Sequence, residues 1–305
     1  MTIAKEMMDT REVAEYLNIN EKLVYRLLKE KKIPGTKVTG KWTFPRRLID
    51  DWIIEGAKEN IGLKNKTKEL KDHIVIMGSN DFAVELLSQE LTKKFPHYSL
   101  SFSNVGSLAG LIALSRGSSH IAGCHLFDPD TRQYNIPYIY RYLPGIKATV
   151  INLVYRDIGL IVKQGNPLSI FSIKDLFRPG IKIINRQQGS GTRVLLDYSL
   201  KKIGIEPNHV DGYEKEVNTH FEVAMAVVSG NADVGLGILP AAKMLNLSFI
   251  HLTNERYDFV IPRENLSAQP IASLIKVMRS LEFHQSINQM GGYDTKDTGK
   301  ILTEV

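Results

Sequence analysis

Cysteine is almost absent from this sequence, because Cys124 is its only one among 305 residues. No disulfide can therefore form within the chain, and a reducing compartment suits it. No apolar run reaches the roughly 18 residues that indicate a membrane-spanning helix. Residues 1–6 also lack the apolar core of a secretion signal. We therefore expect a cytoplasmic protein that makes no membrane contact.

Motifs of the common hydrolases and metalloenzymes are missing as well. Ser190 lies between two glycines but lacks the Gly-x-Ser-x-Gly pattern of a nucleophile elbow. Cys124 and His125 are adjacent, so on a strand they point to opposite faces and cannot form a nucleophile–base pair. The eight histidines show no HExxH-type spacing. We predict that the protein is not an enzyme, and we expect no cofactor and no bound metal cation.

Positive charge is present in modest excess and is unevenly distributed. The net charge is +6 in a chain of ordinary composition, with 43% hydrophobic and 24% charged residues. Between residues 22 and 47 Glu30 is the only acid, whereas the basic residues are Lys22, Arg26, Lys29, Lys31, Lys32, Lys37, Lys41, Arg46 and Arg47. Such a cluster neutralises nucleic-acid phosphates. The alternative is a solvated charged face on a protein-interaction domain.

The first 55 residues predict two short helices joined by a tight turn, which is the outline of a helix-turn-helix. Asp9 and Glu12 have the spacing of a capping box that opens the first helix. Residues 21–29 supply the second helix. A hairpin over 37–44 and a third helix over 46–54 are expected to follow.

These residues resemble the excisionase-type winged helix-turn-helix related to the MerR family. The resemblance rests on Thr10-Arg11-Glu12-Val13-Ala14-Glu15-Tyr16-Leu17, Val24-Tyr25-Arg26-Leu27-Leu28, Ile33-Pro34 and Trp42-Thr43-Phe44-Pro45-Arg46. It implies binding of double-stranded operator DNA, with one helix in the major groove and a wing on the backbone. The predicted DNA contacts are Lys22, Tyr25, Arg26, Lys29, Lys41 and Arg46. For Tyr25, a half-buried place against the wing is the alternative.

Residues 56–72 alternate in charge without an apolar stripe and predict a solvated linker. Residues 73–305 then repeat a strand, a glycine-serine turn and a helix, which is typical of a parallel α/β sheet. Ligands of such sheets collect at the carboxyl ends of the strands. Ser79, Ser107 and Ser190 all take that place. Each alone is explained as an N-cap, but together they predict a shared anion site.

The stretch from 185 to 193 is the strongest anion signal in the sequence. It reads Asn185-Arg186-Gln187-Gln188-Gly189-Ser190-Gly191-Thr192-Arg193 and joins a predicted strand to a predicted helix. Helix N-termini offer unpaired N–H groups, and hydroxyls and guanidinium groups add donors and charge. These groups suit a compact oxyanion, although a glycine-rich connector with solvated arginines is the alternative. Arg193, on the first helical turn, is a weaker candidate than Arg186.

Residues 73–297 resemble a cytoplasmic form of the type II periplasmic-binding-protein fold, as found in molybdate- or tungstate-responsive regulators. The stretches that carry the resemblance are Tyr134-Asn135-Ile136-Pro137, residues 185–193, Asn231-Ala232-Asp233-Val234-Gly235 and Glu255-Arg256-Tyr257-Asp258. It implies an α/β domain of two lobes over 73–305, the second lobe roughly 160–255, with residues 150–163 extended and crossing between them. The predicted oxyanion site comprises Ser79, Asn80, Ser107, His125, Arg186, Gln188, Gly189, Ser190, Gly191 and Thr192.

One departure from the family concerns the ligand. Phosphate binders place an aspartate near the end of the third strand, where it accepts the proton of the ligand, but here His125 takes that place. A cage without a carboxylate acceptor favours a fully deprotonated dianion such as tungstate or molybdate, provided that Asp128 does not reach the site. His125 as a packed, hydrogen-bonded histidine is equally open, and His220 is a further candidate donor.

The sequence as a whole predicts a ligand-responsive transcriptional regulator, which we expect to form a homodimer or a higher homo-oligomer. Two alternatives remain: an accessory protein of molybdenum-cofactor assembly that carries an anion module, or a regulator of a small organic ligand. The basic residues between 22 and 47 argue against the first. The second needs a larger and more apolar pocket.

Overall fold

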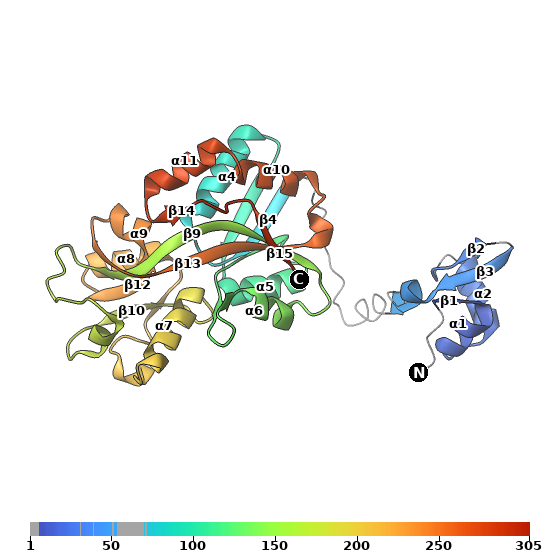
Figure 1. Ribbon diagram of the computed structural model, residues 1–305, viewed down its shortest axis with the longest axis horizontal. Coiled ribbons are helices and arrows are strands. Elements are labelled where there is room, and N and C mark those ends of the chain that lie inside the picture. The colour runs from blue at the N-terminus through green and yellow to red at the C-terminus, as the bar shows by residue number, and fades with distance from the viewer. Residues whose placement is uncertain (1–5, 31, 39, 51, 54–69, 71) are drawn as a thin grey trace. The chain divides into compact units, whose positions relative to one another are not determined.

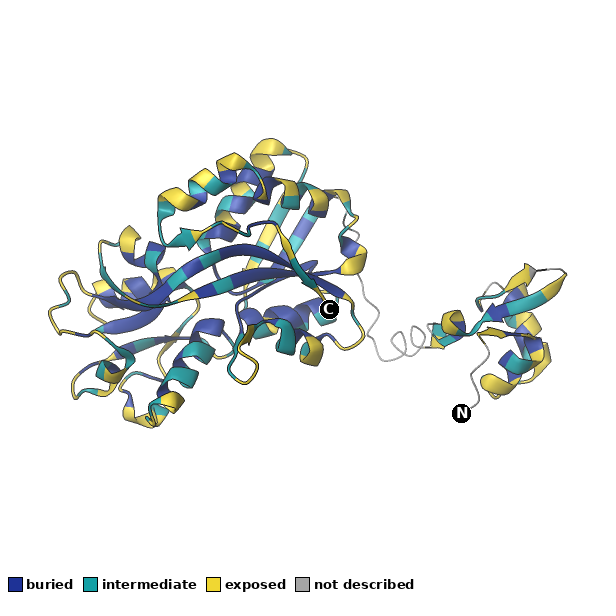
Figure 2. Cartoon of the chain, in the orientation of Figure 1, coloured by how far each residue is buried: buried dark blue, intermediate teal, exposed yellow. Residues whose placement is uncertain are grey.

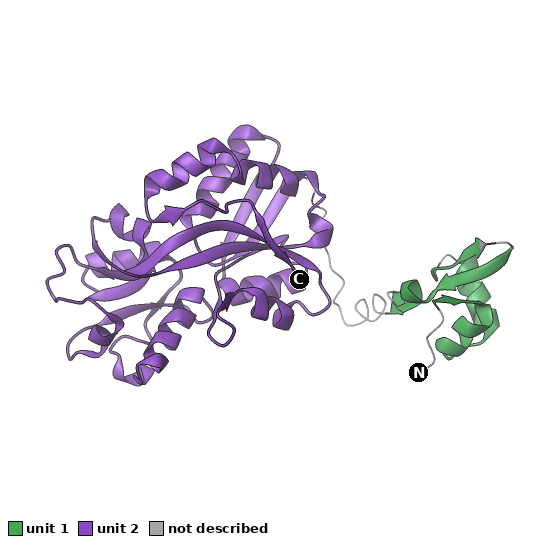
Figure 3. Ribbon diagram, in the orientation of Figure 1, with its two compact units in different colours: residues 1–65 green, residues 66–305 purple. Residues whose placement is uncertain are grey.

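The chain forms two compact units, which cover Met1–Asn65 and Lys66–Val305 (Figure 3). The computed structural model describes residues 6–30, 32–38, 40–50, 52–53, 70 and 72–305. The boundary between the units falls inside the predicted linker of residues 56–72. Most of that linker lies outside the described residues, so its predicted structure stays a prediction.

The first unit contains two helices, α1 (Thr10–Tyr16) and α2 (Glu21–Lys29). Asp9 and Glu12 form the predicted capping box of α1, and Asn20 caps α2. Each cap satisfies N–H groups that a helix start leaves unpaired, which is why helices this short begin where they do. Helical turns also cover residues 46–50 and 52–53, as expected for the third helix.

A small antiparallel sheet completes the first unit. The predicted hairpin is β2 (Thr36–Val38) paired with β3 (Lys41–Pro45). A further strand that the sequence did not predict, β1 (Met7–Met8), pairs with the other edge of β3. The buried core of the unit joins the helices to the sheet through Val13, Val24, Leu28, Phe44 and Ile49.

The second unit is built on one sheet, to which ten strands contribute in the described part of the chain. Its main path runs β11-β10-β12-β9-β13-β6-β4-β5, and β14 and β15 also pair with β9. The bounds are β4 (His73–Gly78), β5 (Ser99–Asn104), β6 (Ile121–Cys124), β9 (Ala148–Val162), β10 (Ile183–Arg186), β11 (Glu216–Val217), β12 (Val234–Ile238), β13 (Ser248–Pro262), β14 (Tyr293–Asp294) and β15 (Ile301–Glu304). A separate hairpin pairs β7 (Phe127–Asp128) with β8 (Gln133–Tyr134).

Helices flank this sheet (Figure 1). They are α4 (Phe82–Lys94), α5 (Ser107–Ser115), α6 (Ile136–Tyr142), α7 (Gly191–Lys202), α8 (His220–Val228), α9 (Leu239–Met244), α10 (Gln269–Met278) and α11 (Leu281–Met290). Three short 3-10 turns cover residues 173–177, 207–209 and 263–265. Within the described residues, no helix combines the length and the apolarity that crossing a membrane requires.

Two long strands divide this unit into the predicted two lobes. β9 and β13 are each 15 residues long, pair antiparallel, and run from one lobe into the other (Figure 1). β9 is buried along nearly its whole length (Figure 2). Buried side chains from β4, α4, α10 and α11 form the core of the first lobe, whereas β10, β12 and α7 supply a core of the second. The two-lobed α/β fold is therefore confirmed, including the crossing predicted for residues 150–163.

Candidate functional site

The anion loop, which we define as residues 185–193, follows β10 and opens α7. Gly189 has a φ of +78°, a left-handed conformation that glycine adopts without strain. Ser190 is the N-cap of α7, and its hydroxyl accepts a hydrogen bond from the Arg193 N–H at 3.2 Å. Ser190 and Thr192 are buried, at 0% and 1% exposed. The loop therefore turns the hydroxyls of Ser190 and Thr192 into the protein and not toward solvent.

Arg186 lies at the end of β10 and is 1% exposed. Its Nε donates to the side-chain oxygen of Gln187 at 3.2 Å, and its Nη2 donates to the Asn218 carbonyl at 2.8 Å. Its Nη1 has no partner among the described residues, and none of their ion pairs includes this guanidinium. Burial, followed by repulsion from Arg156, lowers the pKa of Arg186 to about 9. The group stays charged at neutral pH, so the protein buries a cation that has no ion-pair partner among the described residues, although Glu255 and Glu222 attract it from farther away.

Other polar atoms that have no partner among the described residues are buried in the same lobe. They are Thr192 Oγ1 and both ring nitrogens of His220, which begins α8 behind the N-cap Thr219. Burial and then the neighbouring Arg186 lower the pKa of His220 well below its ordinary value, so the ring is neutral. It offers one N–H and one lone pair. Buried polar groups normally have partners, so this set calls for a ligand.

The first lobe places Ser79, Asn80 and Ser107 opposite the anion loop, and all three are buried. Hydrogen bonds join the lobes directly here. The Asn80 side-chain oxygen accepts from the His220 backbone N–H, and the Gly189 carbonyl accepts from the Leu108 N–H, both at 3.3 Å. The structure thus brings the predicted residues of the two lobes together, and the lobes are closed on each other.

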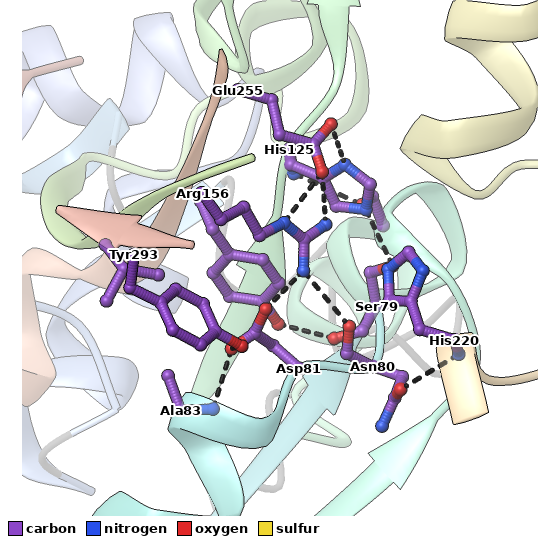
Figure 4. A network of polar contacts seen from close by, with 12 residues as sticks. Ser79, Asn80, Asp81, Ala83, His125, Arg156, His220, Glu255 and Tyr293 are labelled. Atoms are coloured by element: carbon purple, nitrogen blue, oxygen red, sulfur yellow. Dashed lines mark hydrogen bonds and ion pairs between the residues drawn. The ribbon is translucent and has the colours of Figure 1, made fainter. Parts of the chain in front are cut away.

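His125 also lies at this junction, where it is a buried, hydrogen-bonded histidine. Its Nδ1 is 3.1 Å from Glu255 Oε2, and its Nε2 is 2.8 Å from Ser79 Oγ (Figure 4). A Cβ on Gly191 would stand 2.4 Å from this ring, so only glycine fits at the start of α7. Burial outweighs the opposing attraction of Glu255 and lowers the pKa of His125, so the ring is neutral.

Arg156 is the main residue of this region that the sequence did not predict. It is fully buried on β9, and β13 places Glu255 directly opposite. Its Nε donates to Glu255 Oε1 at 2.7 Å, its Nη1 contacts Asp81, and its guanidinium lies 5.0 Å from the Tyr257 ring centroid (Figure 4). Burial alone lowers the pKa of Arg156, but Glu255 and Asp81 outweigh it and raise the pKa. The sequence signal that could have identified Arg156 is its charge within the apolar run of β9, because a buried charge needs a partner.

The acidic residues near the site all have partners of their own. Asp128, on which the prediction of a dianion depended, accepts hydrogen bonds from the N–H and the hydroxyl of Thr131. It belongs to the β7–β8 turn. Asp81 caps α4 and pairs with Arg156. Glu255 is the carboxylate that approaches the site, and the expectation that none does was wrong.

Two residues of the anion loop do not join the buried cluster. Gln188 is exposed, so its assignment to the predicted oxyanion site is not supported, because the turn directs it to solvent. Arg193 pairs with Asp197 at 3.1 Å and with Glu216 at 2.8 Å, and it stacks 4.0 Å from the Tyr213 ring centroid. Arg193 therefore has its own counter-ions, and its Nη1 also donates to the backbone carbonyl of Arg186 at 3.4 Å.

The predicted DNA-binding residues form an exposed face on the first unit. Lys22, Tyr25, Arg26 and Lys29 are exposed along α2, and Lys41 is exposed at the start of β3. Tyr25 is 50% exposed, so it is not buried against the wing. Arg46 differs, because it is only half-exposed and its guanidinium lies 4.5 Å from the Tyr16 ring centroid.

Comparison with known proteins identifies both units. Residues 7–57 match a helix-turn-helix domain, and residues 88–279 match a PBP superfamily domain. The Bacillus subtilis protein YvgK is 35% identical over 306 residues, which cover 96% of each chain. A Clostridium pasteurianum protein from the 5′ region of a 2Fe-2S ferredoxin gene is 36% identical over 113 residues, 37% of this chain and 100% of that one.

Solved structures share the fold of the second unit at low sequence identity. A Clostridium perfringens protein described as a phosphate ABC transporter substrate-binding protein, with bound phosphate, has a TM-score of 0.54 at 16% identity, covering 72% of this chain and 98% of that one. The tungstate ABC transporter structure from Geobacter sulfurreducens has a TM-score of 0.53 at 15% identity, covering 71% and 98%. The chain therefore belongs to the PBP superfamily and carries an N-terminal helix-turn-helix domain, a combination that suggests a DNA-binding regulator with a bound ligand.

Proposed function

We propose that this protein is a transcriptional regulator that senses a tetrahedral oxyanion, tungstate or molybdate, between the lobes of its second unit. The observation that carries the proposal is Arg186, a buried guanidinium with a free Nη1 and no carboxylate partner among the described residues. An unpaired buried charge costs several kcal/mol. An anion beside Arg186 removes that cost, so the closed lobes and the ligand stabilise each other.

The groups around Arg186 favour a compact, multiply charged oxyanion. Thr192 Oγ1 and one His220 nitrogen are unpaired donors on two different helix starts, and helix N-termini attract negative charge. A tetrahedral anion offers oxygens in several directions and can meet such converging donors. The fold neighbours named above include a phosphate-bound protein and a tungstate transporter. The similarity to these two structures is a similarity of fold and does not discriminate between phosphate and tungstate as the ligand.

Lobe closure provides the route from the ligand to DNA. Closure is held by contacts between the lobes, from Asn80 to His220 and from Leu108 to Gly189. A ligand that binds the closed form shifts the population toward it. In a homodimer that shift changes the spacing of the two DNA-binding units, so the affinities for anion and DNA become reciprocally coupled.

Thermal unfolding tests the ligand assignment. Millimolar tungstate or molybdate should raise the melting temperature of the full chain by mass action. An unchanged melting temperature with each of tungstate, molybdate and sulfate would contradict the assignment of an oxyanion as the ligand. Phosphate serves as the competing tetrahedral anion.

A gel shift on the DNA upstream of its own gene tests the regulator. We expect a sequence-specific complex whose affinity falls steeply with salt, and Lys22→Ala with Arg26→Ala should weaken it about tenfold or more and flatten the salt dependence. Both residues are exposed on α2, so their loss should leave the fold intact. A molybdenum-cofactor assembly protein would give no sequence-specific complex, and that outcome would contradict the proposal.

A further inference from the structure

Three residues from three distant parts of the chain form a hydrogen-bonded row at the junction of the lobes. Glu255 on β13 contacts His125 Nδ1 at 3.1 Å, and His125 Nε2 contacts Ser79 Oγ at 2.8 Å. All three side chains are buried, at 2%, 1% and 0% exposed. We call this row the Glu255–His125–Ser79 relay (Figure 4).

The partners in the relay fix where its hydrogens lie. Burial opposes ionisation of Glu255, but Arg156 and His125 outweigh it and lower the pKa of Glu255 to about 2. The ionised carboxylate only accepts, so His125 must donate from Nδ1. A neutral ring then has a lone pair on Nε2, and the Ser79 hydroxyl must donate to it. Ser79 is left with lone pairs alone.

This direction of donation matters because Ser79 stands opposite the anion loop. Gly191 of that loop faces His125, because a Cβ added to it would stand 2.4 Å from His125 Nδ1. An oxyanion oxygen brought to Ser79 would place lone pairs against lone pairs, which is repulsive. One additional proton turns the pair into a donor and an acceptor. The relay and a fully deprotonated ligand together therefore lack one proton, the one needed for a hydrogen bond between Ser79 and the ligand.

The charges around the relay point the same way. Arg156 and Arg186 carry two positive charges, and Asp81 and Glu255 carry two negative ones. These four charges cancel, so an added dianion gives the buried set a net charge of −2. Burying net charge is costly. One bound proton halves that excess.

We propose that the closed site holds its oxyanion together with one proton, which the Glu255–His125–Ser79 relay accommodates. The inference rests on the proposed function. A ligand that keeps a hydroxyl, such as hydrogen phosphate, brings the proton itself and donates it to Ser79. Tungstate or molybdate brings none, so His125 takes a proton from water, donates from both nitrogens, and the Ser79 hydroxyl turns to the ligand. Glu255 and His125 act as positioning residues for Ser79.

Protonation of His125 is set by every group that faces it. Glu255 favours the charged ring, whereas Arg156, Arg186 and burial oppose it. Neutral His220 and the stacked Tyr257 ring, at a centroid distance of 5.8 Å, complete its surroundings. A dianion supplies the missing negative charge, so ligand and proton should bind together.

Calorimetric titration of the full chain in two buffers of different ionisation enthalpy counts the protons. At about pH 8, where the free imidazole is neutral, tungstate should bind with uptake of about one proton, and its affinity should fall about tenfold per pH unit on going more alkaline. Hydrogen phosphate should bind without proton uptake, because it brings the proton itself. Tungstate binding with no proton uptake would overturn the inference and leave the proposed function standing, whereas no oxyanion binding at all would overturn both.

Glu255→Gln is the decisive variant, because a neutral amide no longer attracts a proton to His125 and can itself donate to Nδ1. The neutral ring then donates from Nε2, and the Ser79 hydroxyl can turn to the ligand without an added proton. We expect tungstate to bind this variant with clearly less proton uptake and little pH dependence. Ser79→Ala, which keeps the Glu255–His125 contact, should retain the uptake on His125. Unchanged uptake in Glu255→Gln would show that the proton is bound outside the relay and would contradict the proposal.

Discussion

Two buried arginines of the second unit, Arg156 and Arg186, differ in whether they have counter-ions. Arg156 and Arg186 are 0% and 1% exposed, and both are held by strands of the central sheet. Arg156 has Glu255 and Asp81 as counter-ions, whereas no ion pair of the described residues includes Arg186. Burial lowers the pKa of Arg186 to about 9, and the two carboxylates raise that of Arg156.

The presence or absence of counter-ions indicates a structural role for Arg156 and, in our proposal, a ligand-binding role for Arg186. A buried ion pair whose partners are all satisfied holds elements together, and breaking it is costly. An unpaired buried charge weakens the fold unless a ligand completes it, and such perturbed groups cluster at functional sites. Arg156 therefore holds β9, β13 and the start of α4 together, whereas we propose that Arg186 is held for an anion.

Arg156→Met should have the largest effect on stability. It leaves Glu255 and Asp81 as buried charges without their cation, so we expect a loss of about 3–5 kcal/mol in the free energy of unfolding. Urea unfolding followed by far-UV circular dichroism measures it. A loss no greater than that of Arg193→Met would contradict the structural role.

Arg186→Met should act in the opposite direction when no anion is present. Replacing an unpaired buried charge with an apolar side chain of similar length removes its desolvation cost, so stability should stay level or rise by about 1–4 kcal/mol. The same unfolding assay in anion-free buffer tests this. A large loss of stability would show that Arg186 is a structural residue.

Acid should remove the contribution of the Arg156 cluster to the free energy of unfolding. The folded pKa of Glu255 is about 2, below its unfolded value. A depressed carboxylate pKa stabilises the folded state above the unfolded pKa, and that contribution is lost as the pH falls through about 4 toward 2. A series of urea unfolding curves over this range checks it. In Arg156→Met the same slope should be much smaller.

Arg193→Met should have the smallest effect and serves as the matched control for Arg186. Arg193 lies on the same loop, but its partners Asp197 and Glu216 are partly exposed. Arg193 itself is 4% exposed, but its loss leaves no fully buried carboxylate without a cation, so the destabilisation should be smaller than that of Arg156→Met. Anion binding should be unchanged, as measured by calorimetry with tungstate. Loss of binding in this variant would mean that the anion loop responds to any lost charge.

Local signals made much of this fold predictable. The capping box of Asp9 and Glu12, the N-cap Thr219 and the strand-turn-helix around Ser190 all depend on residues within a few positions of one another. Their hydrogen bonds are short-range, so the sequence displays them directly. The crossing strand over residues 150–163 was predictable from its apolar length.

The buried charge network was not predictable in the same way. Arg156 and Glu255 are 99 positions apart, and only the pairing of β9 with β13 brings them together. His125 and Ser79 are 46 positions apart and belong to different strand ends. The sequence showed that a charge sits inside an apolar strand but not which acid compensates it. Arg193 was already the weaker candidate because it lies on the first turn of a predicted helix, and the structure adds the counter-ions Asp197 and Glu216 that distinguish it from Arg186.

The central claim is that Arg186 is a cation held for an anion. Urea unfolding of the wild-type chain, Arg186→Met and Arg193→Met, each with and without millimolar tungstate, tests it most directly. We predict that tungstate stabilises the wild type and Arg193→Met but not Arg186→Met, which is at least as stable as the wild type without tungstate. Equal stabilisation of all three by tungstate, or an Arg186→Met chain that unfolds more easily without it, would contradict the claim.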